Sequence, residues 1–126
     1  MILLDTDIAI DVLRRHPPAM AWTGSVHDSI CLPGIVALEL YQGCHNKQAV
    51  NSLRKQIAPF AILWPSDQSC DEALKVFTLA HLSHSLGLLD SLIAATALSY
   101  GVPLHTFNQK HFAAVPNLQT IQPYIR

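Results

Sequence analysis

Short runs of apolar residues alternate with longer segments of helical hydrophobic spacing along this 126-residue chain. The first run, Ile2–Leu4, has no alternation of polar side chains, as expected for a parallel strand buried on both faces. Similar runs predict strands at 29–32, 60–63 and 102–106, with 118–121 as a candidate fifth strand. Strands that alternate with helices predict an α/β fold with a central parallel sheet of four to five strands.

Proline, glycine and capping residues mark the expected ends of the helices. Pro17 and Pro18 favour the start of a helix, because the fixed φ of proline suits the first helical turn. Ser66 or Asp67 is expected to cap the longest helix. Gly101 suits the left-handed conformation that often ends a helix. The expected helices cover residues 6–13, 34–43, 47–57, 67–85, 88–100 and 109–114, and another begins at Pro17.

The composition indicates a folded protein with a sizeable core. Half of the residues are hydrophobic, 13% are charged, and the mean hydropathy is +0.26. Disordered chains combine low hydrophobicity with high net charge, so that class is excluded. A length of 126 residues supports one domain, residues 1–126. A chain of this size cannot bury all its apolar side chains, and we therefore expect an apolar surface for a partner.

Neither a membrane span nor a targeting segment is expected. The longest uncharged stretch, 91–109, contains Gly101 and Pro103 and cannot form a continuous apolar helix. The first seven residues contain two acids and no basic residue, unlike a signal peptide. Three scattered cysteines without a CxxC spacing favour the reducing cytoplasm. With a net charge of −1, contact with nucleic acid would depend on a local patch or a metal ion.

The nine acidic residues are informative because of their positions. Asp5 directly follows the first strand, at the carboxyl edge of the sheet where α/β proteins bind ligands. Glu39 shares the apolar face of its helix with Ile35, and Asp90 opens a helix whose inner face is rich in alanine. Three inward carboxylates repel one another and are unfavourable to bury. A divalent cation would satisfy all three, and oxygen-rich sites favour Mg²⁺ or Mn²⁺.

Each acid also has a purely structural interpretation. Asp5 could cap the following helix, Asp90 could interact with a helix dipole, and Glu39 could pair with a distant Lys or Arg. Asp7 and Asp11 lie four residues apart on one helix face, which is expected to be solvated. Asp7 is close enough to Asp5 to support an ion through water, whereas no role is expected for Asp11.

Four segments occur in this order between Leu3 and Phe112: LLDTDIAIDVLR, VALELYQG, LLDSLIAATAL and HTFNQKHF. Together they resemble the PIN domain family, and within it the VapC-type toxins of type II toxin–antitoxin systems. The resemblance implies a three-layer α/β/α fold and metal-dependent hydrolysis of RNA (tRNA, rRNA or mRNA), with Mg²⁺ or Mn²⁺ as the cofactor. It also implies a homodimer that a cognate VapB-type antitoxin neutralises, in a toxin–antitoxin hetero-oligomer.

The same resemblance implies roles for individual residues. Asp5, Glu39 and Asp90 correspond to the metal ligands of the family. The negative charge of Asp7, where the family often has Asn, is expected to support them.

A fourth family position lies in the segment 106–112. There Thr106 and Asn108 are expected to position water or phosphate, while His111 stands where an acid is frequent. The departure at His111 argues against a tightly held second metal. Basic residues expected to guide the RNA backbone are Arg14, Arg15 and Lys110.

The main alternative is a catalytically inactive PIN-like module that binds RNA or a protein partner. The DTD sequence at 5–7 also fits the nucleophile motif of haloacid-dehalogenase-type phosphatases, but Lys75 lacks the later acid pair of that family. His81 and His84 share a helix face without the ligand pairs of a zinc site. No GxGxxG is present to indicate a dinucleotide site.

Overall fold

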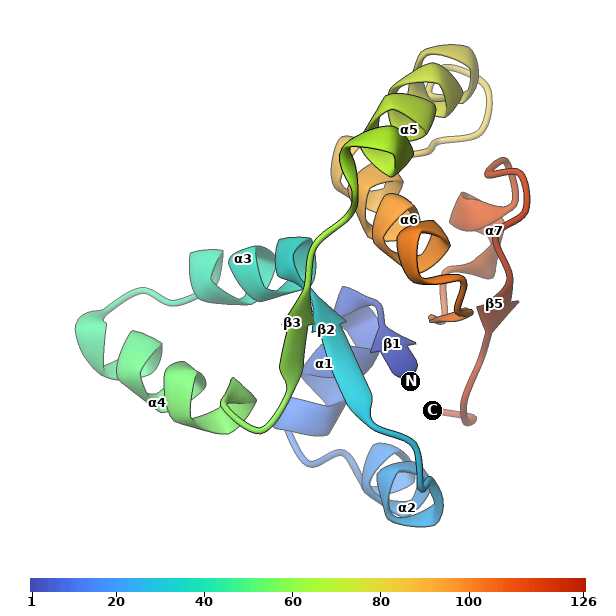
Figure 1. Cartoon of the computed structure of the whole chain (residues 1–126). Coiled ribbons are helices and arrows are strands. Elements are labelled where there is room, and N and C mark those ends of the chain that lie inside the picture. The colour runs from blue at the N-terminus through green and yellow to red at the C-terminus, as the bar shows by residue number, and fades with distance from the viewer.

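A five-stranded parallel sheet forms the centre of the structure, a computed structural model that describes residues 1–126 (Figure 1). The strands are β1 (Ile2–Leu4), β2 (Ile30–Pro33), β3 (Ala61–Leu63), β4 (Leu104–His105) and β5 (Thr120–Ile121). Their order across the sheet is β3-β2-β1-β4-β5, and every neighbouring pair is parallel. All three residues of the central β1 are buried, which explains its lack of polar alternation.

Seven helices connect the strands and cover the sheet. They are α1 (Thr6–Leu13), α2 (Pro17–Ser25), α3 (Gly34–Gln42), α4 (Lys47–Ile57), α5 (Asp67–Ala80), α6 (Leu88–Tyr100) and α7 (Gln109–Phe112). Side chains cap the starts of α4 and α5: Asn46 Oδ1 accepts the Ala49 backbone N–H at 2.8 Å, and the Ser66 hydroxyl accepts the Ser69 backbone N–H at 3.1 Å. Gly101 ends α6 with a φ of +63°, a left-handed conformation that favours glycine.

The connections divide the helices into two layers on opposite faces of the sheet. The chain moves from β1 to β2 and β3 in one direction, and then returns across the sheet to β4 and β5. Because such crossovers are right-handed, α1–α4 lie on one face and α6 and α7 on the other, with α5 packed along α6 outside the sheet. Figure 1 shows α3 and α4 on the opposite side of the strands from α6 and α7. The direction of winding changes between β1 and β4, the place where open sheets bind ligands.

Apolar side chains from both layers form a core of 18 buried residues. Leu3 and Leu104 of the central strands are fully buried, and α6 contributes the small side chains of Ala94 and Ala97. The longest helix, α5, packs chiefly along α6. None of the helices has both the length and the apolar character that a membrane span requires.

Two elements differ most from the sequence-based prediction. Helix α5 ends at Ala80 instead of near Ser85, because the chain continues as turns and Ser85 adopts a φ of +54°. This turn returns the chain to the core at Leu86, which is 2% exposed. Strand β4 has two residues instead of five. Pro103 immediately precedes it and cannot donate a backbone hydrogen bond to a ladder.

Candidate active site

Asp5 lies where the sheet changes its winding direction. It follows β1 directly, its backbone N–H donates to the carbonyl of His105 in β4 at 2.9 Å, and it is 4% exposed. The Thr106 hydroxyl donates to Asp5 Oδ2 at 2.7 Å, and the Thr6 backbone N–H donates to Oδ1 at 2.8 Å. With one hydrogen bond on each oxygen, the carboxylate retains lone pairs that can bind a further ligand.

The surroundings of Asp5 disfavour its charged form. Burial, with smaller contributions from the charges of Asp7 and Asp90, raises the pKa of Asp5 from 3.8 to about 6. The hydrogen bonds from Thr106 and Thr6 lower this pKa but do not outweigh burial. A nearby cation would therefore stabilise the ionised carboxylate.

Asp7 holds the loop that follows β4 against the start of α1. Its Oδ2 accepts the Phe107 backbone N–H at 2.9 Å and the Asn108 side-chain amide at 3.4 Å, and its Oδ1 accepts the Ile8 backbone N–H at 2.7 Å. The Asn108 backbone N–H donates to the Thr106 hydroxyl at 2.9 Å. Burial raises the pKa of Asp7, although the hydrogen bonds from Phe107 and Ile8 lower it. These contacts bring Thr106 and Asn108 beside two of the predicted acids.

Glu39 and Asp90 approach this region from α3 and α6. Burial raises the pKa of the half-buried Glu39, the Thr6 hydroxyl lowers it, and the charge of Asp90 raises it. Asp90 Oδ2 accepts the Gly87 backbone N–H at 3.3 Å, so this acid also has the helix-start role considered from the sequence. Because the charge of Asp90 affects both Asp5 and Glu39, the three acids form one electrostatic cluster.

The chemistry of the acidic cluster suits a hard divalent cation. None of the three acids of the cluster forms an ion pair. The two ion pairs of the protein involve Glu72 and Asp11. The Thr6 hydroxyl, next to Asp5 in the chain, is buried and has no partner within hydrogen-bonding geometry, although it lies near enough to Glu39 to lower the pKa of that carboxyl. Oxygen ligands of this kind fit Mg²⁺ or Mn²⁺. No three His, Cys, Asp or Glu side chains lie close enough together to enclose one ion, so these carboxylates would bind it partly through water or after drawing closer.

The other predicted site residues are more exposed. The side chain of His111 on α7 forms neither a hydrogen bond nor an ion pair, and Asn108 reaches only Asp7 with its amide. Lys110 and Arg15 are exposed. The structure does not bring His111, Lys110 or Arg15 into the acidic cluster, and Asn108 adjoins it only through Asp7, so the roles of all four stay predictions.

A groove of about 570 Å³ opens beside the acidic cluster between α1, α3 and α4. Thr6 and Glu39 line it together with Arg14, the one predicted RNA-guiding residue that borders this groove. Its apolar lining includes Ile10, Leu13, Leu40 and Leu53. The groove therefore gives a ligand access to Glu39.

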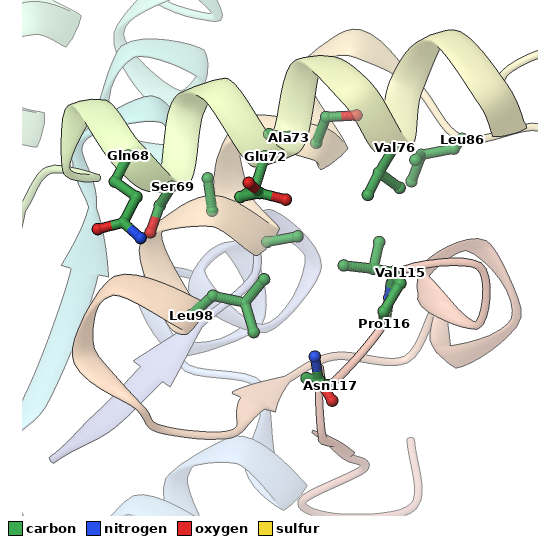
Figure 2. A pocket seen from close by; sticks show the side chains of 13 residues that line it. Gln68, Ser69, Glu72, Ala73, Val76, Leu86, Leu98, Val115, Pro116 and Asn117 are labelled. Carbon is green, nitrogen blue, oxygen red and sulfur yellow. The ribbon is translucent and has the colours of Figure 1, made fainter.

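A second cavity, of about 260 Å³, lies between α5, α6 and residues 115–117 (Figure 2). Ala73 and Val76 of α5 face Leu98 and Val115 across it. None of the predicted site residues lines this cavity. The groove, and not this cavity, is the opening associated with the acids.

The prediction that Asp11 lies on a solvated helix face is wrong. This residue is only 9% exposed, and Arg126 binds it with two hydrogen bonds, from Nε to Oδ2 at 2.9 Å and from Nη2 to Oδ1 at 3.1 Å. The Tyr124 hydroxyl also donates to Oδ2 at 2.8 Å. Burial raises the pKa of Asp11, but the hydrogen bonds from Arg126 and Tyr124 outweigh burial and hold the pKa below its ordinary value. Two acids four residues apart on a helix repel each other, which favours a nearby cation, but nothing in the sequence indicates that Arg126 is that cation.

Comparison with known families and structures identifies the class of protein. Residues 2–118 match the PIN domain family, so the chain belongs to that family. The chain is 29% identical over 133 residues to ribonuclease VapC of Rickettsia bellii, a match that covers 95% of this chain and 94% of that protein.

Two solved structures show the same fold. A chain in the structure of VapBC-1 from nontypeable Haemophilus influenzae has a TM-score of 0.78 and 28% identity, covering 96% of this chain and 97% of that chain. A chain of VapBC2 from Rickettsia felis, bound to a DNA fragment from their promoter, has a TM-score of 0.77 and 25% identity, covering 96% and 98%. The predicted α/β fold and the resemblance to PIN domains are confirmed.

Proposed function

We propose that this protein is a metal-dependent endoribonuclease that hydrolyses phosphodiester bonds in RNA. The observation that carries the proposal is the cluster of Asp5, Glu39 and Asp90 at the carboxyl edge of the sheet, which has no Lys or Arg ion pair. Membership of the PIN domain family and the similarity to a protein named ribonuclease VapC support the same activity.

Each residue of the site has a definite task in this proposal. Asp5, Glu39 and Asp90 would hold Mg²⁺ or Mn²⁺, directly or through water. When bound, the ion activates water and stabilises negative charge on the phosphate. Thr106 fixes the orientation of the Asp5 carboxylate through its hydrogen bond. Glu39, with its raised pKa, would accept a proton from the attacking water, and the exposed Asn108 would donate to a phosphate oxygen.

The expected reaction adds water across one P–O3′ bond of the RNA backbone. The products would carry a 5′-phosphate and a 3′-hydroxyl. Arg14, Arg15 and Lys110 would contact phosphates on either side of the cleaved bond.

We also propose that a VapB-type antitoxin is the protein partner and that the chain forms a homodimer. The groove between α1, α3 and α4 combines apolar walls with Glu39, so a partner segment lying in it would cover the site. Relatives of similar fold were solved as VapBC assemblies. Exposed leucines on and after α5, including Leu79 and Leu82, offer a further apolar surface.

The activity can be tested with purified protein and total tRNA and mRNA in the presence of Mg²⁺, Mn²⁺ or EDTA. Asp90→Asn is the test variant, and Asp28→Asn, an exposed acid before β2, is the matched control. We expect cleavage by the wild type and Asp28→Asn with metal, and no cleavage with EDTA or by Asp90→Asn. Sequencing of the product ends would identify the target.

Two outcomes would contradict the proposal. Equal cleavage by the wild type and Asp90→Asn would show that the activity comes from elsewhere. RNA binding without cleavage under any metal condition, together with no uptake of Mn²⁺ in calorimetry, would indicate the inactive binding module.

A further inference from the structure

The residues after β5 return to α1 and end beside the acidic site. Figure 1 shows the chain continuing from β5 to the C-terminus without a further helix or strand. Arg126 binds both oxygens of Asp11 in the middle of α1, and its Nη2 lies 3.5 Å from the carbonyl oxygen of Asp7 at the start of that helix. Tyr124 adds the third hydrogen bond to Asp11. This segment is therefore fixed to α1 along one helical turn.

The same two side chains enclose Phe107. The guanidinium carbon of Arg126 lies 4.6 Å from the centre of the Phe107 ring, a stacking distance for a cation on an aromatic face. The Tyr124 ring meets Phe107 edge to face, with 5.1 Å between ring centres and an interplanar angle of 76°. Phe107 is thus held on one side by a cation and on another by an aromatic ring.

The position of Phe107 matters because its backbone belongs to the site loop. Its N–H donates to Asp7 Oδ2 at 2.9 Å. The preceding residue, Thr106, binds Asp5, and the following residue, Asn108, directs its amide toward Asp7. A shift of the Phe107 ring would move both neighbours relative to the acids.

We propose that Arg126 is a positioning residue of the acidic site: its guanidinium, anchored on Asp11, presses on Phe107 and fixes the loop 106–108 against Asp5 and Asp7. The consequence for catalysis rests on the proposed ribonuclease function, whereas the consequence for the loop does not. The Arg126 side chain is 50% exposed, whereas that of Asp11 is 12% exposed and keeps the Tyr124 hydroxyl as a donor when Arg126 is removed. Loss of the ion pair therefore costs some global stability, and a positioning role predicts a larger effect at the loop that Arg126 contacts.

The test compares full-length Arg126→Ala and Arg126→Lys with the wild type. Ile125→Ala is the matched control, because Ile125 lies in the same segment and is 85% exposed. Hydrogen exchange is followed in metal-free buffer at the Phe107 amide and at the Leu32 amide in β2. In Arg126→Ala we expect exchange at Phe107 to be faster by about fivefold or more, with a clearly smaller change at Leu32. Lysine lacks the planar two-donor group, so Arg126→Lys should restore little of the protection, and Ile125→Ala should match the wild type.

Two further measurements connect the loop to the site. Titration with Mn²⁺ alone should show weaker binding to Arg126→Ala, and RNA cleavage by this variant should lose kcat with little change in KM. Equal acceleration of exchange at Phe107 and Leu32, no acceleration at all, or full restoration by lysine would overturn the inference. If the wild type cleaves no RNA, the proposed function fails, and the exchange and Mn²⁺ results still decide the role of Arg126.

Discussion

The Asp5 carboxyl group combines full burial with a net electrostatic environment that opposes its charge. Its pKa in the folded protein is about 6, against an ordinary value of 3.8. Well below pH 3.8 the group is protonated in both the folded and the unfolded chain and has no effect on stability. As the pH rises from 4 to 6, ionisation increasingly favours the unfolded chain. Above pH 6 ionisation of Asp5 lowers the free energy of unfolding of the metal-free protein by about 3 kcal/mol, which is the free-energy equivalent of the difference between the two pKa values.

Asp5→Asn should therefore stabilise the metal-free protein in a pH-dependent way. An asparagine can accept the Thr6 N–H with its oxygen and donate to the Thr106 hydroxyl with its amide, so both hydrogen bonds can be kept. We expect an increase in the free energy of unfolding of up to about 3 kcal/mol at pH 7.5 and only about 0.5 kcal/mol at pH 4. Urea unfolding in EDTA at the two pH values measures this difference.

The exposed Asp28→Asn serves as the control and should change stability by less than about 0.5 kcal/mol at either pH. An equal effect of Asp5→Asn at pH 4 and pH 7.5 would show that the carboxyl group is not charged unfavourably in the fold.

The sequence could predict some of these residues and not others. Asp5, Glu39 and Asp90 are visible because acids are rare in this chain and each of these adjoins apolar residues. The contact between Asp11 and Arg126 joins residues 115 positions apart, and no local pattern reports such a pairing. That the buried Thr6 hydroxyl lacks a hydrogen-bond partner is likewise known only from the positions of its neighbours in the fold.

The first residue of α3 must be small because the side chain of Trp64 packs directly against it. Gly34 is the first residue of α3, and a Cβ at that position would overlap the indole ring of Trp64, which follows β3. In contrast, a Cβ on Gly24 near the end of α2 would meet nothing within 4 Å. The two glycines are thus in helices but under opposite steric constraints.

Gly34→Ala and Gly24→Ala should consequently change stability in opposite directions. Alanine favours helix by up to about 1 kcal/mol over glycine, and Gly24→Ala should gain about 0.5 kcal/mol. Gly34→Ala must displace Trp64 and should lose about 1–3 kcal/mol. Urea unfolding followed by far-UV circular dichroism measures both, and a gain in Gly34→Ala would show that Trp64 does not pack on this helix.

Helices were more predictable than strands in this fold. The predicted bounds of α1, α4 and α6 match the structure, because a cap, a proline or a glycine stands at an end of each. Strands β4 and β5 have two residues each, too few for periodicity to define their ends. The order of the strands across the sheet depends on contacts between distant segments, so local sequence patterns do not predict it.

At the scale of the whole molecule, a nearly neutral chain concentrates repelling acids at one edge of its sheet. The net charge is −1, yet Asp5, Asp7, Glu39 and Asp90 lie in one region. Binding of a divalent ion to this region, and not general screening, should relieve the repulsion.

Mn²⁺ should accordingly raise the stability of the folded protein. At about one hundred times its Kd, the ion should add about 2.7 kcal/mol to the free energy of unfolding of the wild type and much less to Asp5→Asn. Thermal unfolding in EDTA, in Mn²⁺ and in NaCl of equal ionic strength separates binding from screening. Equal stabilisation by NaCl and Mn²⁺ would argue against an ion held by these acids.

The adjacency of β1 and β4 has a consequence for the order of events during synthesis. The hydrogen bond between Thr106 and Asp5 joins residues 101 positions apart. The site is therefore complete only after β4 has paired with β1. N-terminal segments leave the ribosome first, and contacts of such sequence separation close late in folding. A nascent chain that still lacks residues 104–126 thus carries Asp5 without its hydroxyl partner and Asp11 without its arginine. A nuclease built in this way would lack a complete active site until residues 104–126 have left the ribosome.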